Sequence, residues 1–132
     1  MNPGFRGIAV FLLLEIFSFS LQTLPGYALA RSSKTFPITM SVDFGPAGKA
    51  THHSTLDVEK GTTPKEAVSQ AFPIISGKSC CSLREVISID GVRVDPAKRR
   101  WWTCWVNGSK NISPQNYKLR PGDRVEWKYI QD

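Results

Sequence analysis

Three cysteines and two adjacent histidines are the side chains of this sequence with the chemistry of metal ligands. Zinc binds such groups, here His52, His53, Cys80, Cys81 and Cys104. Adjacent residues of a strand point to opposite faces, so only one of the two histidines could join a given site. No two cysteines have the two-residue spacing typical of zinc sites. We therefore expect no metal site.

Catalytic patterns are also absent from the sequence. It contains neither Gly-x-Ser-x-Gly nor His-Glu-x-x-His, and no paired carboxylates framed by apolar residues. Asp90, Asp95 and Asp123 lie beside turn residues, where carboxylates usually cap backbone amides. We expect a non-catalytic protein that requires no cofactor.

The cysteines predict one disulfide. Neighbours such as Cys80 and Cys81 rarely pair, because a disulfide needs its two Cα atoms farther apart than adjacent residues allow. Cys104 is therefore expected to pair with Cys80 or Cys81, contributing about 3 kcal/mol. The remaining thiol is either a small buried hydrophobe, which we favour, or an intermolecular or reactive group.

The first thirty residues have the pattern of a signal peptide. A positive charge precedes the apolar run 7–21, and Ala28-Leu29-Ala30 has the small-x-small pattern of a cleavage site. The run is short for a membrane span, which needs about 20 apolar residues. We expect residues 1–30 to be removed and the protein to be secreted, periplasmic or extracellular, with no membrane span after cleavage.

The formal net charge of +6 favours acidic partners. The densest cationic group is Lys98, Arg99 and Arg100, which is more often a solvated rim than a nucleic-acid site. We expect no nucleic-acid partner.

Residues 31–35 are expected to be a polar tail, followed by one domain at 36–132. Alternating apolar residues predict strands near 36–44, 50–58, 85–89, 101–106 and 124–130. Thr63-Pro64-Lys65-Glu66 predicts a capped helix start, Pro73 its end, and 74–83 a loop. This order favours an α+β class, with one helix packed on one face of a mixed sheet. A β-grasp is the simplest such fold.

The chain resembles a known family over about residues 36–129, most specifically in its C-terminal block. The motif residues are Trp102-x-x-x-Val106-Asn107-Gly108 and Tyr117-x-Leu119-x-x-Gly122-Asp123-x-Val125-x-Trp127-x-Tyr129. They are similar to the small C-terminal domain of transcobalamin and intrinsic factor, which also occurs in exported bacterial proteins of unknown function. The resemblance implies a β-grasp-like binding module, and with it a cobalamin-like ligand. In the transporters a helical domain completes the enclosure. Without that partner, the module could bind a corrinoid or another planar molecule, or act with a second protein.

The strand predicted at 101–106 has two different faces. Trp102, Cys104 and Val106 form an apolar face assigned to the core, whereas Trp101 and Trp105 lie about 7 Å apart on the other. In the family these two positions are commonly glycine and a small or polar residue. The two indoles either cover the open side of the sheet or form a stacking platform or a protein anchor.

Two functions remain open from the sequence. The first is a small-molecule binding module with a site at Trp101, Trp105, Asn107 and Tyr117. The alternative is a protein-interaction module that docks on an acidic partner through the tryptophan pair and the rim Lys98, Arg99 and Arg100.

Overall fold

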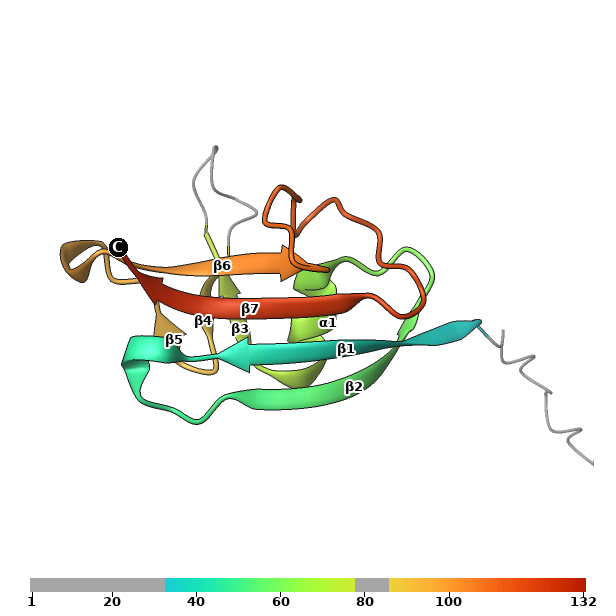
Figure 1. The fold of residues 1–132 in the computed structure, drawn as a ribbon, viewed down its shortest axis with the longest axis horizontal. Helices are drawn as coiled ribbons and strands as arrows, with labels where there is room; N and C mark the ends of the chain where they lie inside the picture. The colour runs from blue at the N-terminus through green and yellow to red at the C-terminus, as the bar shows by residue number, and fades with distance from the viewer. Residues whose placement is uncertain (1–32, 78–85) are drawn as a thin grey trace, which may run out of the picture. The chain divides into compact units, whose positions relative to one another are not determined.

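The computed structural model describes residues 33–77 and 86–132 (Figure 1). In these ranges the chain forms strands and one α-helix in the order β1 (Thr35–Asp43), β2 (His52–Glu59), α1 (Pro64–Ala71), β3 (Ile74–Ser76), β4 (Val86–Ile89), β5 (Val92–Arg93), β6 (Arg100–Val106) and β7 (Arg124–Gln131). Two 3-10 turns, η1 (Gly45–Ala47) and η2 (Pro96–Lys98), complete the described elements. No helix within these ranges is long and apolar enough to cross a membrane.

A four-stranded mixed sheet forms one layer. Its order is β2-β1-β7-β6, with β1 and β7 parallel and the two outer pairings antiparallel. Strand alternation directs Ile38, Met40 and Val42 of β1 into the core, where each is at most 2% exposed. The less apolar β2 lies at an edge. β6 forms the opposite edge.

The predicted fold class, an α+β β-grasp-like sheet with a packed helix, is wrong. The second layer contains a three-stranded antiparallel sheet of order β3-β4-β5, and α1 has only eight residues, so the described domain is mostly β. Pro64 is the first residue of the helix, and Pro73, two residues after its end, keeps it short. The residues after Pro73 are β-branched, and Ile74 pairs with Ile89 of β4 instead of forming the predicted loop. The remainder of that predicted loop, 78–83, lies outside the described residues.

The local signal for the start of α1 is confirmed. Thr63 accepts a hydrogen bond from the Glu66 amide, and the Glu66 carboxylate accepts one from the Thr63 amide, which completes the capping box. The 90–91 and 107–108 turns have positive φ at both central residues, as a type I′ turn requires.

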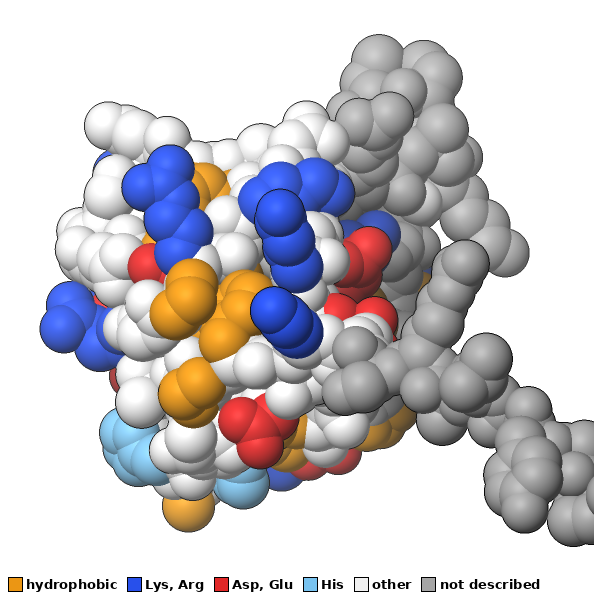
Figure 2. All heavy atoms as spheres, turned by 90° about the vertical axis from the view of Figure 1, so that its right-hand side faces the viewer, with side chains coloured by type: hydrophobic (Ala, Val, Ile, Leu, Met, Phe, Trp, Pro, Cys, Tyr) orange, Lys and Arg blue, Asp and Glu red, His pale blue; other side chains and the backbone are white. Residues whose placement is uncertain are grey.

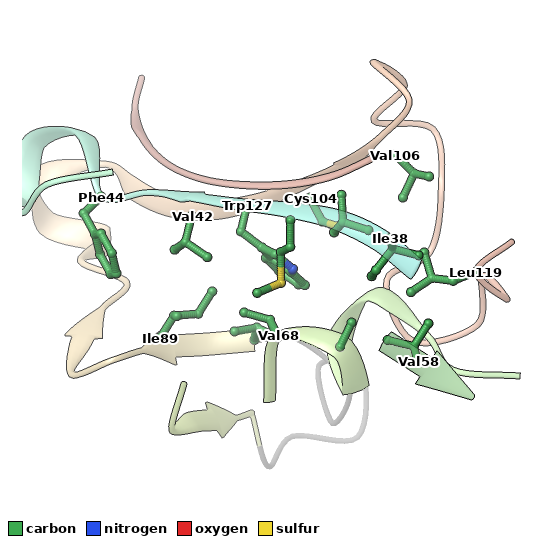
Figure 3. Close-up of a cluster of buried hydrophobic side chains, with 14 residues drawn as sticks. Ile38, Val42, Phe44, Val58, Val68, Ile89, Cys104, Val106, Leu119 and Trp127 are labelled. Carbon is green, nitrogen blue, oxygen red and sulfur yellow. The ribbon is translucent and has the colours of Figure 1, made fainter. Parts of the chain in front are cut away.

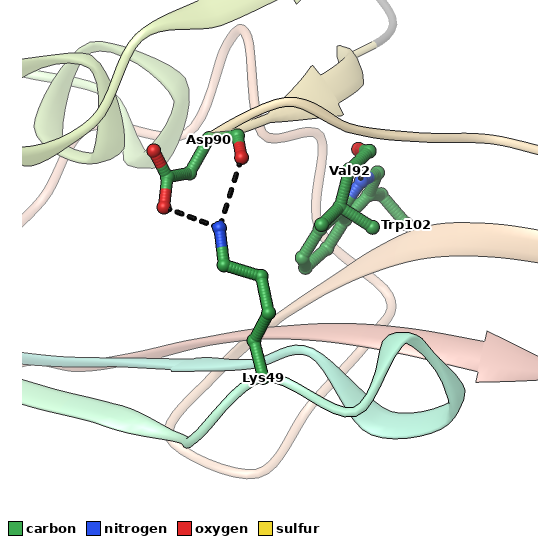
Figure 4. Close-up of polar contacts among 4 residues, drawn as sticks. All are labelled: Lys49, Asp90, Val92 and Trp102. Atoms are coloured by element: carbon green, nitrogen blue, oxygen red, sulfur yellow. Dashed lines mark hydrogen bonds and ion pairs between the residues drawn. The ribbon is translucent and has the colours of Figure 1, made fainter.

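Buried apolar side chains join the two layers. Val42, Trp127 and Cys104 of the four-stranded sheet face Val68 of α1 and Ile89 of β4 (Figure 3). Polar contacts reinforce this packing. Lys49 Nζ donates to the Asp90 carboxylate at 2.7 Å and to the Asp90 carbonyl at 3.1 Å (Figure 4).

Candidate functional site

β6 carries the residues on which the candidate site is built. Cys104 and Val106 are buried on its inner face, at 6% and 3% exposure, and Trp102 packs against the same core, as the alternation predicted. Trp101 faces the other way, opposite Ile130 of β7, and is 38% exposed. Because β6 is an edge strand, its indoles are available to a groove beside the sheet.

A cavity of about 640 Å³ lies along this edge. Three segments that are distant in the sequence line it, namely the β4–β5 region, β6 and the loop 113–116, together with one β7 side chain. The described lining residues are Val86, Ile87, Val94, Trp101, Trp102, Cys104, Ser113, Pro114, Gln115, Asn116 and Trp127. None of them carries a formal charge, and three are tryptophans.

The two inner indoles of the cavity differ in their hydrogen bonding. Trp102 Nε1 donates to the carbonyl oxygen of Val92 at 2.8 Å, which fixes that ring against β5. Trp127 is only 2% exposed, and its Nε1 is buried without an acceptor in the described part of the chain. Trp127 points from the sheet into the space between the layers (Figure 3). A buried N–H without an acceptor costs about 1–3 kcal/mol, so this donor is exceptional.

Cys104 is a buried free cysteine at the inner wall of the cavity. Burial raises the pKa of its thiol, so the group remains protonated and unreactive at neutral pH. Cys80 and Cys81 lie outside the described residues, and the predicted disulfide stays a prediction.

Trp105, predicted as a ligand-binding residue, does not line this cavity. Its ring lies on the outer face of the sheet, with Lys128 Nζ 5.0 Å and Lys110 Nζ 5.8 Å from the ring centroid. Its Nε1 donates to Thr103 Oγ1 at 3.4 Å. The structure therefore places Trp101 and Trp105 in different surroundings, although both lie on the outer face of β6.

Asn107 and Tyr117, the other two predicted ligand-binding residues, meet at a carboxylate. Asn107 Nδ2 donates to Asp123 Oδ1 at 2.9 Å, and the Tyr117 hydroxyl donates to Asp123 Oδ2 at 3.1 Å. The Arg120 amide also donates to Oδ2, at 2.9 Å. This Asp123 network closes the loop between β6 and β7, so both side chains have a structural role.

Tyr117 also lines a shallower hollow of about 400 Å³ at one end of the domain. Lys60, Lys118 and Arg120 border that hollow, and Leu119 contributes to its floor. Figure 2 views this end, where Lys and Arg side chains lie above and beside a hydrophobic patch. The hollow is separate from the cavity beside β6, since the two share no lining residue.

The Asp123 network makes the free energy of unfolding depend on pH in the alkaline range. Burial, then the hydrogen bond to Asp123 and its negative charge, raise the pKa of the Tyr117 phenol above 10.0. The folded state therefore holds this proton more tightly than the unfolded state, and the resulting stabilisation is present below pH 10 and lost as pH rises further. We expect Tyr117→Phe to cost about 1 kcal/mol at pH 7. The difference between wild type and variant should shrink as pH rises above 10 in urea unfolding.

Cys104 also has a raised pKa, but both proteins contain it, so its contribution cancels in that difference. A difference that stays constant from pH 8 to pH 11 would contradict the assigned hydrogen bond.

The predicted basic rim, which consists of Lys98, Arg99 and Arg100, lies at the end of η2 and at the start of β6. Asp95 caps this turn by accepting from the Lys98 amide at 3.2 Å, and Arg99 ends it in the left-handed conformation with φ 55°. Arg100 Nε donates to Gln131 Oε1 at 3.2 Å, whereas Arg99 is exposed. The rim directly precedes Trp101, so an exposed indole and exposed cations adjoin.

The described ranges contain no group of three or more His, Cys, Asp or Glu residues placed to hold a metal ion. Sequence reasoning missed most of the cavity wall, above all the loop 113–116 and the β4 residues Val86 and Ile87. A polar loop and a short strand carry no local pattern that assigns them to a shared wall.

The fold is related to known structures. The model of a domain of unknown function (DUF4430) matches residues 84–131. The chain is similar to haptocorrin solved in complex with Cbi, with a TM-score of 0.61 and 15% identity over 75% of this chain and 26% of that chain. It is similar, too, to a “putative metal binding protein” from Ruminococcus gnavus, with a TM-score of 0.58 and 20% identity over 74% of this chain and 98% of that chain.

No curated protein matches the chain. The chain spans about a quarter of haptocorrin. At these identities the likeness is one of fold.

Proposed function

We propose that this chain is a non-catalytic binding module that holds a planar small molecule, such as one edge of a corrinoid, in the cavity beside β6. The observation that carries the proposal is the cavity itself, an uncharged space beside a sheet edge with three tryptophans in its wall. Ligand sites are typically concave and apolar, with a few polar groups that fix orientation. The loop 113–116 supplies such polar groups here.

The cavity size sets what part of a ligand is enclosed. About 640 Å³ is within the range of sites for drug-sized molecules. A corrinoid macrocycle with its side chains exceeds this space, so one edge would enter while the rest stays outside. Fold likeness to about a quarter of haptocorrin agrees with a partial enclosure, which a second protein could complete.

The proposal also includes export, as the N-terminal sequence predicts. A binding module with this role would act outside the cytoplasm and would catalyse no reaction. Sequencing the N-terminus of protein recovered from the medium or the periplasm tests this part, and the expected first residue is Arg31.

Binding of cobalamin tests the proposed site. We expect Trp101→Ala to raise the dissociation constant about tenfold, because the ligand loses an aromatic surface at the mouth of the cavity. Tryptophan fluorescence gives the binding curve. The dissociation constant is the readout, since a coloured corrinoid quenches every nearby tryptophan and the amplitude says little about position.

Trp105→Ala is the matched control, because it removes an indole from the same face of β6 but not from the cavity wall. Its dissociation constant should stay within about twofold of wild type. Equal effects of the two substitutions, or no saturable binding of cobalamin or cobinamide, would refute the proposed site.

A protein-interaction function is a second candidate, favoured by one observation. Trp101 is 38% exposed and directly follows the exposed Arg99 and the partly exposed Arg100. An aromatic anchor beside cations suits an acidic protein surface. This alternative predicts that a partner is retained from extracellular extract in a salt-sensitive way. Retention should be lost in a Trp101→Ala/Trp105→Ala double variant, and equal retention by that variant would exclude this candidate.

A further inference from the structure

We infer that the cavity binds its ligand through a neutral carbonyl or carboxamide oxygen that accepts a hydrogen bond from Trp127 Nε1. This inference rests on the proposed function for the site and specifies the chemical group that enters it. It concerns Trp127, which the sequence analysis named only as a residue of the family motif.

The first support is the state of the Trp127 indole. Its residue is 2% exposed, it lines the cavity, and its Nε1 has no acceptor in the described part of the chain. Indole N–H is a donor only, so an acceptor must come to it. Most buried polar groups in folded proteins are paired, and those left unpaired often mark a functional position or a bound molecule.

The neighbouring Trp102 shows that the lack of an acceptor is not common to every indole N–H of the cavity wall. Trp102 lies on the adjacent strand, and its Nε1 is engaged by the Val92 carbonyl at 2.8 Å. The two inner indoles thus have different roles. Trp102 is fixed by the protein backbone, whereas Trp127 lines the cavity and its buried Nε1 has no acceptor in the described part of the chain.

The charge of the wall defines the class of acceptor. None of the described lining residues is Asp, Glu, Lys or Arg. A carboxylate or phosphate buried there would lack a countercharge, and its desolvation would cost more than one neutral donor returns. A ketone, ester or carboxamide oxygen avoids that cost and still satisfies the N–H. The rest of the inserted group should be apolar, to suit Val86, Val94 and the indole faces.

Two small probes test the inference on the wild-type chain. Acetophenone and α-methylstyrene differ only in that a carbonyl oxygen replaces a methylene group. We expect acetophenone to bind about fivefold more tightly, although α-methylstyrene is the more apolar molecule. In ¹⁵N-edited proton spectra, acetophenone should move the Trp127 indole N–H resonance downfield, and α-methylstyrene should not.

A variant pair assigns the effect to one indole. Trp127→Phe keeps an aromatic ring but removes the donor, so the preference for acetophenone should disappear. Trp102→Phe removes a donor that the protein already uses, so it should leave the preference intact. Equal binding of the two probes by the wild-type chain, or a preference that survives in Trp127→Phe, would overturn the inference. If Trp127→Phe fails to fold, Phe variants of the other three tryptophans assign the Trp127 resonance by elimination, so the inference remains testable.

The outcomes also separate this inference from the proposed function. Acetophenone preference without binding of any corrinoid would remove the corrinoid proposal and leave the Trp127 donor site. Corrinoid binding that depends on Trp101 but leaves the Trp127 indole resonance unchanged would support the cavity and remove the donor site.

Discussion

Gly45→Ala is expected to destabilise the domain by about 3 kcal/mol, because two separate costs meet at this residue. Gly45 begins η1 with a φ of 41°, a backbone conformation that residues other than glycine rarely adopt. In addition, an alanine Cβ would overlap the backbone carbonyl oxygen of Tyr129 in β7. A backbone atom of a central strand cannot move aside without disturbing the sheet. Urea unfolding measures the loss.

Gly48→Ala is the matched control for this prediction. Gly48 ends the same turn with a φ of 77°, but its Cβ would meet no atom within 4 Å. Only the cost of the left-handed conformation remains, about 1 kcal/mol. Equal losses in the free energy of unfolding for the two variants would contradict the close approach of Gly45 to the Tyr129 carbonyl oxygen.

Asp123→Ala is expected to have a comparable effect, about 3 kcal/mol. Asp123 is 6% exposed and accepts hydrogen bonds from Asn107, Tyr117 and the Arg120 amide. Hydrogen bonds to a charged group contribute about 1.5–3 kcal/mol each but do not add fully, and the substitution leaves three donors without this acceptor. Thermal or urea unfolding gives the change in the free energy of unfolding.

The control for Asp123 is Asp123→Asn, which keeps the shape and one of the two acceptor oxygens. We expect about half the loss, because the two donors to Oδ2 or the one donor to Oδ1 must then face an amide N–H₂. An Asp123→Ala variant as stable as wild type would show that this loop is held by other contacts.

The parts of the fold that the sequence predicted are those encoded by neighbouring residues. Alternation placed Cys104 and Val106 in the core and Trp101 outside, because side chains of a strand alternate between its faces. The Thr63 capping box depends on only four consecutive residues. Such signals do not depend on how distant segments pack.

The fold class was wrong because its second layer depends on pairing between short segments. β3, β4 and β5 have three, four and two residues, too few for a periodic pattern. Their stability comes from contacts such as Ile74 opposite Ile89 and from Tyr129 Oη, which donates to the Arg93 carbonyl at 2.7 Å. Propensity gives little information about such long-range partners.

The residues of the candidate site were likewise predicted only in part from the sequence. The sequence selected Trp101 as a ligand-binding residue, and the structure places it in the cavity wall. Trp127 entered the sequence analysis only as a residue of the family motif, with no ligand contact assigned to it. Its lack of an acceptor follows from the arrangement of neighbouring segments, which no local pattern encodes. Trp105, Asn107 and Tyr117, which the sequence also selected, do not line this cavity.

The indole N–H resonances of the four tryptophans give the most direct test of the central claim, that ligand binds in the cavity beside β6. Single Trp→Phe variants assign the four signals. Titration with cobalamin should shift the signals of Trp101, Trp102 and Trp127, which line the cavity, and leave that of Trp105, which does not. A shift confined to Trp105, or no shift at saturating cobalamin, would contradict the account.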